Sequence, residues 1–209
     1  MYFHLVIGPQ NCRYHSLEEI VLAAIQGGVT HVQLRDKQAT SRELLAMGHR
    51  LLALVHSKNR TLIINDRVDI ALAINADGVH LGQNDLPYPI ARKLLGPDKI
   101  IGLTIESMEQ LQQANDWQPN YIGVGPIFET QTKPDAPSAI GVKQLAKLTR
   151  VSRHPVIAIG GINLSNAESV LEAKVNGLAV VSAVAHAQDA QQASHQLKAM
   201  IDMKGLCWS

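Results

Sequence analysis

The residues best suited to chemistry follow an apolar run in the second half of the chain. The run YIGVGPIF, residues 121–128, is followed within a few positions by Thr130, Thr132 and Lys133. Hydroxyl groups and a cation are donors that proteins use to hold an anion. The spacing therefore predicts an anion-binding loop directly after an apolar strand.

A second row of donors lies in the segment VQLRDK. Gln33, Arg35 and Lys37 alternate along it, so in a strand they would point to the same side. Arginine supplies a forked contact and lysine a point charge, which together suit a polyanion. The alternative interpretation is a solvated strand end whose charge is balanced by Asp36, and this segment alone leaves it open.

Two carboxylates follow two further apolar runs. Asp66 ends the segment LIIND, and Asp85 lies in GVHLGQND. Carboxylates after adjacent strands can hold one divalent cation, with water and substrate oxygens completing the shell, as Mg²⁺ is usually held beside phosphates. Each aspartate alone also fits a helix N-cap, because a helical pattern follows it. Their pairing opposite the Arg–Lys row favours a metal and a diphosphate between them.

The last two apolar runs end in small residues. Gly160 and Gly161 permit a close backbone approach, and Val181 and Ser182 supply further donors. In barrels of alternating strands and helices, the loops after strands 7 and 8 often bind phosphate through backbone N–H groups and the start of a helix. These segments therefore predict a monophosphate site. A tight turn that needs glycine is the alternative for the glycine pair.

These residues need a scaffold that brings them together. Short apolar runs, typical of buried parallel strands, alternate along the chain with amphipathic segments. The expected strands are residues 3–8, 30–35, 61–66, 77–82, 99–104, 121–128, 155–161 and 177–182. The clearest expected helices are residues 16–28, 41–59, 107–116 and 163–175. Ser16 with Glu19 predicts a cap for the first of these helices, and Asn163 or Ser165 a cap for the last.

Eight strands with intervening helices favour an α/β fold, a single (β/α)₈ TIM barrel forming one catalytic domain over residues 1–209. An open doubly wound sheet is the alternative, but the first turn, GPQNC, is no dinucleotide fingerprint. Barrel active sites lie at the C-terminal ends of the strands, so the polar residues there should converge on one mouth. That rule adds Asn65 and Thr104 to the candidates. His80, inside an expected strand, is interpreted as a hydrogen-bonded histidine of the barrel.

The composition excludes some classes of partner. Lys and Arg number 19 against 18 Asp and Glu, a formal charge of +1, which gives no general attraction for nucleic acid or an acidic membrane. No apolar run approaches the ~20 residues of a membrane span. The start, MYFHLVIGPQ, does not resemble a signal peptide. We expect a cytoplasmic protein that acts on small molecules, and the sequence leaves a homo-oligomer open.

The motifs together resemble the thiamine-phosphate synthase family. They occur in unbroken order from about Leu5 to about Ala185 and read QLRDK, IINDRVDIAL, ADGVHLGQNDLP, YIGVGPIF, TQTKPDAP, AIGGI and AVVSA. Members are (β/α)₈ barrels that join 4-amino-5-hydroxymethyl-2-methylpyrimidine diphosphate to 4-methyl-5-(2-phosphoethyl)thiazole, and they require Mg²⁺. The products are thiamine monophosphate and diphosphate. The resemblance therefore implies a Mg²⁺-dependent transferase of thiamine biosynthesis.

The resemblance also implies roles for individual residues. The pyrimidine diphosphate would be bound by Gln33, Arg35, Lys37, Asn65, Thr104 and Lys133, in a segment that includes Leu34 and Asp36. Mg²⁺ would be ligated by Asp66 and Asp85. The thiazole phosphate would be bound by Thr130, Gln131, Thr132, Gly161, Val181 and Ser182. The catalytic roles would fall to Arg35, Lys37, Thr104 and Lys133.

One segment departs from the family pattern. In GLTIES many members have serine where this chain has Thr104 and histidine where it has Glu106, so the hydroxyl is kept and Glu106 receives no role. Two alternatives remain: an isomerase on the same barrel that aromatises the thiazole, and a non-catalytic sensor of thiamine precursors. The isomerase would need no metal site, and a sensor often has a degraded one. Asp66 and Asp85 argue against both.

Overall fold

The computed structural model describes residues 1–130, 132 and 138–206. Eight parallel strands form a closed barrel in which each strand pairs with the next and β8 pairs with β1. The strands are β1 (Tyr2–Ile7), β2 (His31–Leu34), β3 (Thr61–Asn65), β4 (Gly78–Leu81), β5 (Ile100–Ile105), β6 (Tyr121–Val124), β7 (Val156–Ile159) and β8 (Gly177–Val180). The closed ring confirms the predicted TIM barrel and excludes the open doubly wound sheet.

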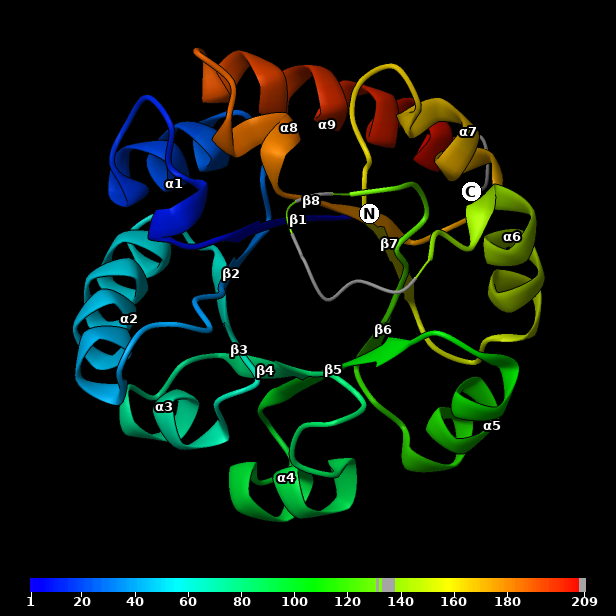
Figure 1. Cartoon of the computed structure of the whole chain (residues 1–209), viewed down its shortest axis with the longest axis horizontal. Coiled ribbons are helices and arrows are strands. Elements are labelled where there is room, and N and C mark those ends of the chain that lie inside the picture. Colours follow the sequence, from blue (N-terminus) through cyan, green and yellow to red (C-terminus); the bar gives the residue numbers. More distant parts are fainter. Residues whose placement is uncertain (131, 133–137, 207–209) are drawn as a thin grey trace.

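Helices surround this ring of strands, as Figure 1 shows. They are α1 (Leu17–Gln26), α2 (Ser41–His56), α3 (Val68–Ala73), α4 (Tyr88–Leu95), α5 (Met108–Trp117), α6 (Gly141–Val151), α7 (Ala167–Glu172), α8 (Ser182–Ala185) and α9 (Ala190–Leu206), with a 3₁₀ turn η1 (Pro9–Asn11) after β1. Helix α9 packs against both α1 and α7, so it covers the part of the barrel where β8 meets β1.

The strands are apolar on both faces because each face is buried. One large cluster of aliphatic side chains fills the layer between the strands and the helices, and Leu5, Val32 and Leu62 belong to it. A smaller cluster, which includes Val6 and Ile157, fills the barrel interior. Burial on both faces is what makes such strands read as continuous apolar runs.

The start of α1 has the predicted cap. The Glu19 N–H donates to Ser16 Oγ at 3.3 Å, and the Ser16 N–H donates to Glu19 Oε2 at 2.8 Å. These two bonds satisfy backbone donors that the first turn of a helix leaves without partners. The predicted capping box therefore forms at this helix.

The predicted cap of α7 was wrong. That helix begins at Ala167 after Asn166, not directly after Asn163 or Ser165. The Asn163 side-chain oxygen accepts the Ser165 N–H at 2.9 Å, which makes a local turn two residues long. The side chain that was expected to cap the helix therefore orders the loop before it.

None of the helices in the described part of the chain combines the length and the apolar character needed to cross a lipid bilayer.

Candidate active site

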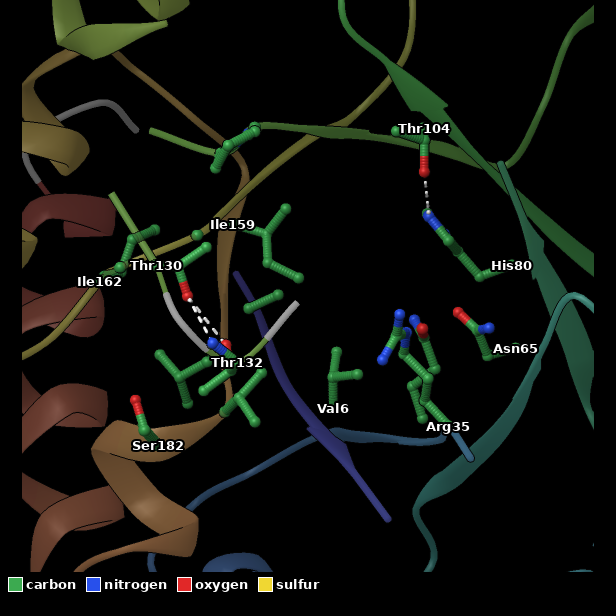
Figure 2. Close-up of a pocket in the computed structure, with 18 of the residues that line it drawn as sticks. Val6, Arg35, Asn65, His80, Thr104, Thr130, Thr132, Ile159, Ile162 and Ser182 are labelled. Carbon is green, nitrogen blue, oxygen red and sulfur yellow. Dashed lines mark hydrogen bonds between the residues drawn. The ribbon is translucent and has the colours of Figure 1, made fainter. Parts of the chain in front are cut away.

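The C-terminal ends of the strands open into one cavity. Figure 2 shows Thr130, Thr132 and Ser182 on one side of it, Arg35 on the other, and Val6 between them. The predicted site residues that line the cavity are Gln33, Arg35, Asn65, Thr104, Thr130, Thr132, Gly161, Val181 and Ser182. The barrel thus brings together side chains and backbone groups that are spread over most of the sequence.

Other predicted residues lie elsewhere. Lys37, Asp66 and Asp85 do not line this cavity, and Lys37 contacts Asp66. The Leu34 side chain packs in the core between strands and helices, and only 1% of its surface is exposed. The Asp36 carboxylate accepts backbone N–H groups two and three residues further along the chain. Gln131 and Lys133 lie outside the described residues.

We call the residues around the ends of β2, β3 and β4 the charged side of the mouth. They are Arg35, Lys37, Asn65, Asp66 and Asp85. Alternation along a strand places Gln33 in the wall of the barrel, but β2 ends at Leu34, so the alternation does not extend to Lys37. The Lys37 side chain is about half exposed at 48%, and its Nζ lies 3.5 Å from Asp66 Oδ2.

The backbone around Asp66 fixes the place of its carboxylate. Asp66 has a φ of 63°, in the left-handed region that few residues other than glycine, asparagine and aspartate adopt. Its N–H donates to the carbonyl oxygen of His80 at 2.8 Å, which ties the end of β3 to β4. Neither carboxylate caps the helix that follows it, because α3 is preceded by Arg67 and α4 by Pro87. The Asp85 carboxylate instead accepts the Gly82 N–H at 2.7 Å.

The two carboxylates of the charged side influence each other. Burial, together with hydrogen bonding to Asp85 and the charge of Asp85, raises the pKa of Asp66 to about 6, and Lys37 opposes that rise. A carboxyl group that resists ionisation beside another carboxylate is stabilised as an anion when a cation joins the pair. Within the described residues no group of three or more His, Cys, Asp and Glu side chains is placed to hold a metal. A cation here would therefore need oxygens from water or substrate as well.

We call the opposite wall the neutral side of the mouth. It consists of Thr130, Thr132, Gly161, Val181 and Ser182. The Thr130 and Thr132 hydroxyls lie 2.8 Å apart, and the Thr132 N–H donates to Thr130 Oγ1 at 3.3 Å. The side chains of this group carry no formal charge, so these residues would hold an anion through dipoles.

The loop after β7 requires glycine for two reasons. Gly160 and Gly161 have φ values of 102° and 65°, in the left-handed region. A Cβ on Gly160 would lie 2.5 Å from Pro126 Cα, and one on Gly161 would lie 2.7 Å from the Glu129 carbonyl oxygen. The loop therefore packs directly on the chain after β6. This contact places the neutral-side residues of two loops next to each other.

Three backbone donors of the neutral side are available to a ligand. The N–H groups of Gly161, Val181 and Ser182 donate to no oxygen of the residues that the structure describes. The predicted helix start contributes little, because α8 is only four residues long. Backbone N–H groups that converge without acceptors form a site for a phosphate or a similar anion.

The sequence analysis missed part of the cavity wall. Val6, Ile159 and Ile162 add apolar surface to the cavity wall, and Glu106 also lines the cavity. The alternation that placed Gln33 inward also applies to Val6, which pairs with it in register, but the register between strands cannot be read from the sequence. Apolar walls with a few polar groups suit flat ring systems that carry charged substituents.

His80 lines the same cavity and is hydrogen-bonded, as the sequence interpretation predicted. Its Nε2 lies 2.9 Å from Thr104 Oγ1, and its Nδ1 lies 3.0 Å from the hydroxyl of Tyr121. Tyr121 was not among the predicted site residues. Its partner is 41 positions away in the chain, so no local sequence pattern could have indicated the contact.

Comparisons with known proteins agree on one family. The family model described as thiamine monophosphate synthase matches residues 3–184. The chain is 46% identical over 186 residues to a thiamine-phosphate synthase from Roseiflexus sp. strain RS-1, covering 89% of this chain and 79% of that protein. It is 47% identical over 199 residues to one from Azorhizobium caulinodans, covering 95% and 94% of the two chains.

A solved structure extends the agreement to the fold. Thiamine phosphate pyrophosphorylase from Pyrococcus furiosus superposes with a TM-score of 0.88 at 35% identity, covering 97% of this chain and 96% of that one. A 3-hexulose-6-phosphate synthase from Salmonella typhimurium superposes with a TM-score of 0.74 at 12% identity, a likeness in fold alone. The match to the family model and the identities to its members go well beyond such a likeness, and the chain belongs to the thiamine monophosphate synthase family.

Proposed function

We propose that this protein is a thiamine-phosphate synthase. It would join the methylene carbon of 4-amino-5-hydroxymethyl-2-methylpyrimidine diphosphate to the ring nitrogen of 4-methyl-5-(2-phosphoethyl)thiazole, and release diphosphate. The observation that carries the proposal is a single barrel mouth with a charged side, of which Arg35 and Asn65 line the cavity, and a neutral side. The two sides match the two phosphorylated substrates of this reaction.

The charged side is assigned to the pyrimidine diphosphate. Arg35 can give a forked contact to two phosphate oxygens, and Lys37 can add a point charge. The present contact between Lys37 and Asp66 is long and half exposed, so it can be exchanged for a contact with substrate at little cost. Lys133, outside the described residues, is assigned to the same substrate from the family pattern.

Mg²⁺ is assigned to Asp66 and Asp85. The donor set fits this ion, because Mg²⁺ prefers oxygen ligands and is usually held by one or two carboxylates together with phosphate oxygens and water. The raised pKa of Asp66, due to burial and to Asp85, also fits a pair that ionises fully when a cation is present. When bound, the ion would neutralise negative charge that builds on the departing diphosphate.

The neutral side is assigned to the phosphate of the thiazole. The hydroxyls of Thr130 and Thr132 and the backbone N–H groups of Gly161 and Ser182 can surround a monophosphate. The anchor would place the thiazole ring over the apolar wall. There its nitrogen faces the reacting carbon of the other substrate, and such positioning lowers the entropic barrier of a reaction between two molecules.

The proposed chemistry is a dissociative alkyl transfer. The carbon–oxygen bond between the pyrimidine methylene and the diphosphate breaks, and the electron pair leaves with the diphosphate. The aminopyrimidine ring delocalises the positive charge on the methylene, and the thiazole nitrogen then forms the new carbon–nitrogen bond with its lone pair. The role of Arg35 and Lys37 is electrostatic, since they stabilise charge that develops on the leaving group.

The two alternatives are not favoured. An isomerase that aromatises the thiazole needs a general acid or base, but no paired carboxylates opposite an arginine. A sensor without turnover gives no reason for the coupling between Asp66 and Asp85. The relatives at 46% and 47% identity are both named thiamine-phosphate synthases.

The deciding experiment supplies both substrates with and without Mg²⁺. We expect thiamine monophosphate and diphosphate to form in equal amounts, and only when the metal is present. Each substrate alone is the control, because a synthase releases diphosphate only when the thiazole phosphate captures the pyrimidine. Binding of the thiazole phosphate without either product would contradict the proposal and would favour isomerisation or sensing.

A further inference from the structure

A chain of hydrogen bonds runs from the cavity into the barrel interior. Thr104 of β5 bonds to His80 of β4 at 2.9 Å, and His80 bonds to Tyr121 of β6 at 3.0 Å. Figure 2 shows the bond between Thr104 and His80 at the cavity wall. Thr104 is the only member to which the family resemblance gave a role. The other two therefore require an explanation of their own.

Tyr121 determines the direction of the chain. Its hydroxyl is fully buried among strand residues, and burial raises the pKa of Tyr121 above its usual value, so the phenol keeps its proton. Among the described residues, the only hydrogen-bond partner of this hydroxyl is His80 Nδ1. A buried O–H without an acceptor costs about 1 to 3 kcal/mol. The Tyr121 O–H therefore donates, and His80 Nδ1 must present a lone pair.

The lone pair on Nδ1 determines that the other ring nitrogen, Nε2, is protonated. An imidazole whose Nδ1 accepts a hydrogen bond carries its single ring proton on Nε2. Nε2–H then donates to Thr104 Oγ1, which accepts at 2.9 Å. The Thr104 hydroxyl still has its own proton, and His80 Nε2 cannot accept it. That proton is free to point into the cavity that Thr104 lines.

We propose that Tyr121 and His80 are positioning residues that hold Thr104 as a hydrogen-bond donor toward the pyrimidine diphosphate substrate. This inference rests on the proposed function, because it concerns how one substrate of that reaction is bound. A donor at this point suits an acceptor atom, which the substrate offers both as phosphate oxygens and as ring nitrogens. The reversed chain would present a lone pair to the same atoms and would repel them.

The packing around the two rings keeps the chain in one arrangement. A Cβ on Gly102 would lie 2.2 Å from Tyr121 Cζ, and one on Gly123 would lie 3.0 Å from His80 Cε1. The two strand glycines thus provide the space that the rings fill. The rings of His80 and Tyr121 stack with centroids 5.5 Å apart, and His4 meets Tyr121 edge-on at 5.1 Å. A ring held on several sides cannot turn to exchange its two nitrogens without displacing its neighbours.

The direct test is the tautomer of His80, measured by ¹⁵N NMR on the full chain without substrates. We expect a protonated, pyrrole-type Nε2 and an unprotonated, pyridine-type Nδ1. In Tyr121→Phe the O–H donor is absent, and we expect the pyridine-type signal of Nδ1 to weaken as the other tautomer becomes populated. A proton on Nδ1 in the unsubstituted protein would overturn the proposal. So would an unchanged tautomer in Tyr121→Phe.

The kinetic test compares variants along the chain. Tyr121→Phe and His80→Leu should lower kcat/KM for the pyrimidine diphosphate about 5- to 10-fold, the effect of one neutral hydrogen bond, and leave the KM for the thiazole phosphate unchanged. His80→Gln should recover most of the loss of His80→Leu, because an amide N–H can replace Nε2–H. Equal loss in the glutamine and leucine variants, or an equal rise in both KM values, would indicate a structural role only and overturn the proposal.

Two binding probes identify the substrate atoms that Thr104 contacts. In Thr104→Val we expect weaker binding of inorganic diphosphate if the donor meets the phosphate, or of the pyrimidine alcohol if it meets the ring. Thr104→Ser keeps the hydroxyl and is the matched control. Unchanged binding of both probes in Thr104→Val would overturn the proposal. If the unsubstituted protein formed no thiamine phosphate, the proposed function would fail. The NMR measurement would still decide the direction of the hydrogen bonds from Tyr121 through His80 to Thr104.

Discussion

The two sides of the mouth differ in how they can hold an anion. The charged side presents the side chains of Arg35 and Lys37 beside the paired carboxylates of Asp66 and Asp85. The neutral side uses hydroxyls and backbone N–H groups, around glycines packed against the neighbouring loop. Figure 2 shows Arg35 and Ser182 on opposite sides of Val6. One barrel mouth therefore presents two chemically different groups of residues, and of the charged side Arg35 and Asn65 line the cavity.

The proposed function gives the two sides different tasks. A leaving diphosphate gains negative charge during the reaction, and full charges stabilise that gain more strongly than dipoles do. The phosphate of the thiazole remains unchanged, so neutral donors that fix its position are sufficient. If this assignment holds, changes on the charged side should affect turnover and pyrimidine binding, and changes on the neutral side should affect thiazole binding alone.

The largest effect is expected from Asp66→Asn. Loss of a metal ligand removes several kcal/mol of charge stabilisation, so we expect turnover at saturating substrates and Mg²⁺ to fall at least ~100-fold. Asp69→Asn is the matched control, because Asp69 is exposed and pairs with Arg67. Near-normal turnover in Asp66→Asn would contradict the assignment of the metal and of turnover to the charged side.

The same variant should be more stable than the unsubstituted chain. The pKa of Asp66 is raised by burial to about 6, above the unfolded value, so the folded protein binds more protons between about pH 4 and pH 6. The contribution of Asp66 to stability therefore falls as pH rises through that window and is unfavourable at pH 7. Asparagine also tolerates the φ of 63°. Denaturation at pH 7 should give Asp66→Asn a free energy of unfolding about 1 kcal/mol above that of the unsubstituted protein. This difference should disappear near pH 4.

A smaller effect is expected from Arg35→Ala. One charge-assisted hydrogen bond contributes about 1.5 to 3 kcal/mol, so the KM for the pyrimidine diphosphate should rise about 10- to 100-fold. The KM for the thiazole phosphate should stay the same. The KM of Arg35→Lys for the pyrimidine diphosphate should lie between the values of the unsubstituted protein and of Arg35→Ala, because lysine keeps the charge and loses the forked contact. Arg42→Ala, an exposed position on α2, is the control. Equal rises in both KM values would contradict the assignment of sides.

The Mg²⁺ requirement should depend on pH. Protons and Mg²⁺ compete for Asp66, whose pKa is raised by burial and by Asp85 to about 6. The half-saturating Mg²⁺ concentration should therefore rise about tenfold per unit below pH 6 and level off above it.

The substrates also titrate, so a variant is needed to assign this pH dependence. Lys37 lowers the pKa of Asp66. In Lys37→Gln the pH below which the half-saturating Mg²⁺ concentration begins to rise should therefore be higher. If the rise began at the same pH in Lys37→Gln as in the unsubstituted protein, the titrating group would belong to the substrate and not to the enzyme.

Most of the fold was predictable because burial on both faces leaves a strong local signal. Each expected strand overlaps one strand of the barrel, and the order of strands follows from the alternation with helices. The closure of the ring then places every strand end at one mouth. The residues of both sides could be proposed from the sequence because each lies at or shortly after the end of an apolar run.

What the sequence could not give depends on contacts between distant segments. The position of the Asp66 carboxylate depends on a left-handed backbone and on a bond from the Asp66 N–H to the His80 carbonyl oxygen, neither of which has a local pattern. Its raised pKa depends on burial and on Asp85, which follows a different strand. Lys37 was expected beside Arg35 on one strand face, but β2 ends too early, and the side chain turns toward Asp66. Within the described part of the chain, Tyr121 is joined to the site by its hydrogen bond to His80. Each of these contacts can be predicted only when the register between strands is known.

The smallest effect tests the neutral side itself. Ser182→Ala removes one hydroxyl from the cavity wall and keeps the backbone N–H, so only a neutral hydrogen bond of about 0.5 to 1.5 kcal/mol is lost. The KM for the thiazole phosphate should rise about 2- to 10-fold, while the KM for the pyrimidine diphosphate and the Mg²⁺ requirement stay the same. Ser57→Ala, at the C-terminal end of α2, is the control. A loss comparable to that of Arg35→Ala would mean that the hydroxyl meets developing charge, and the neutral side would then take part in bond breaking rather than in anchoring alone.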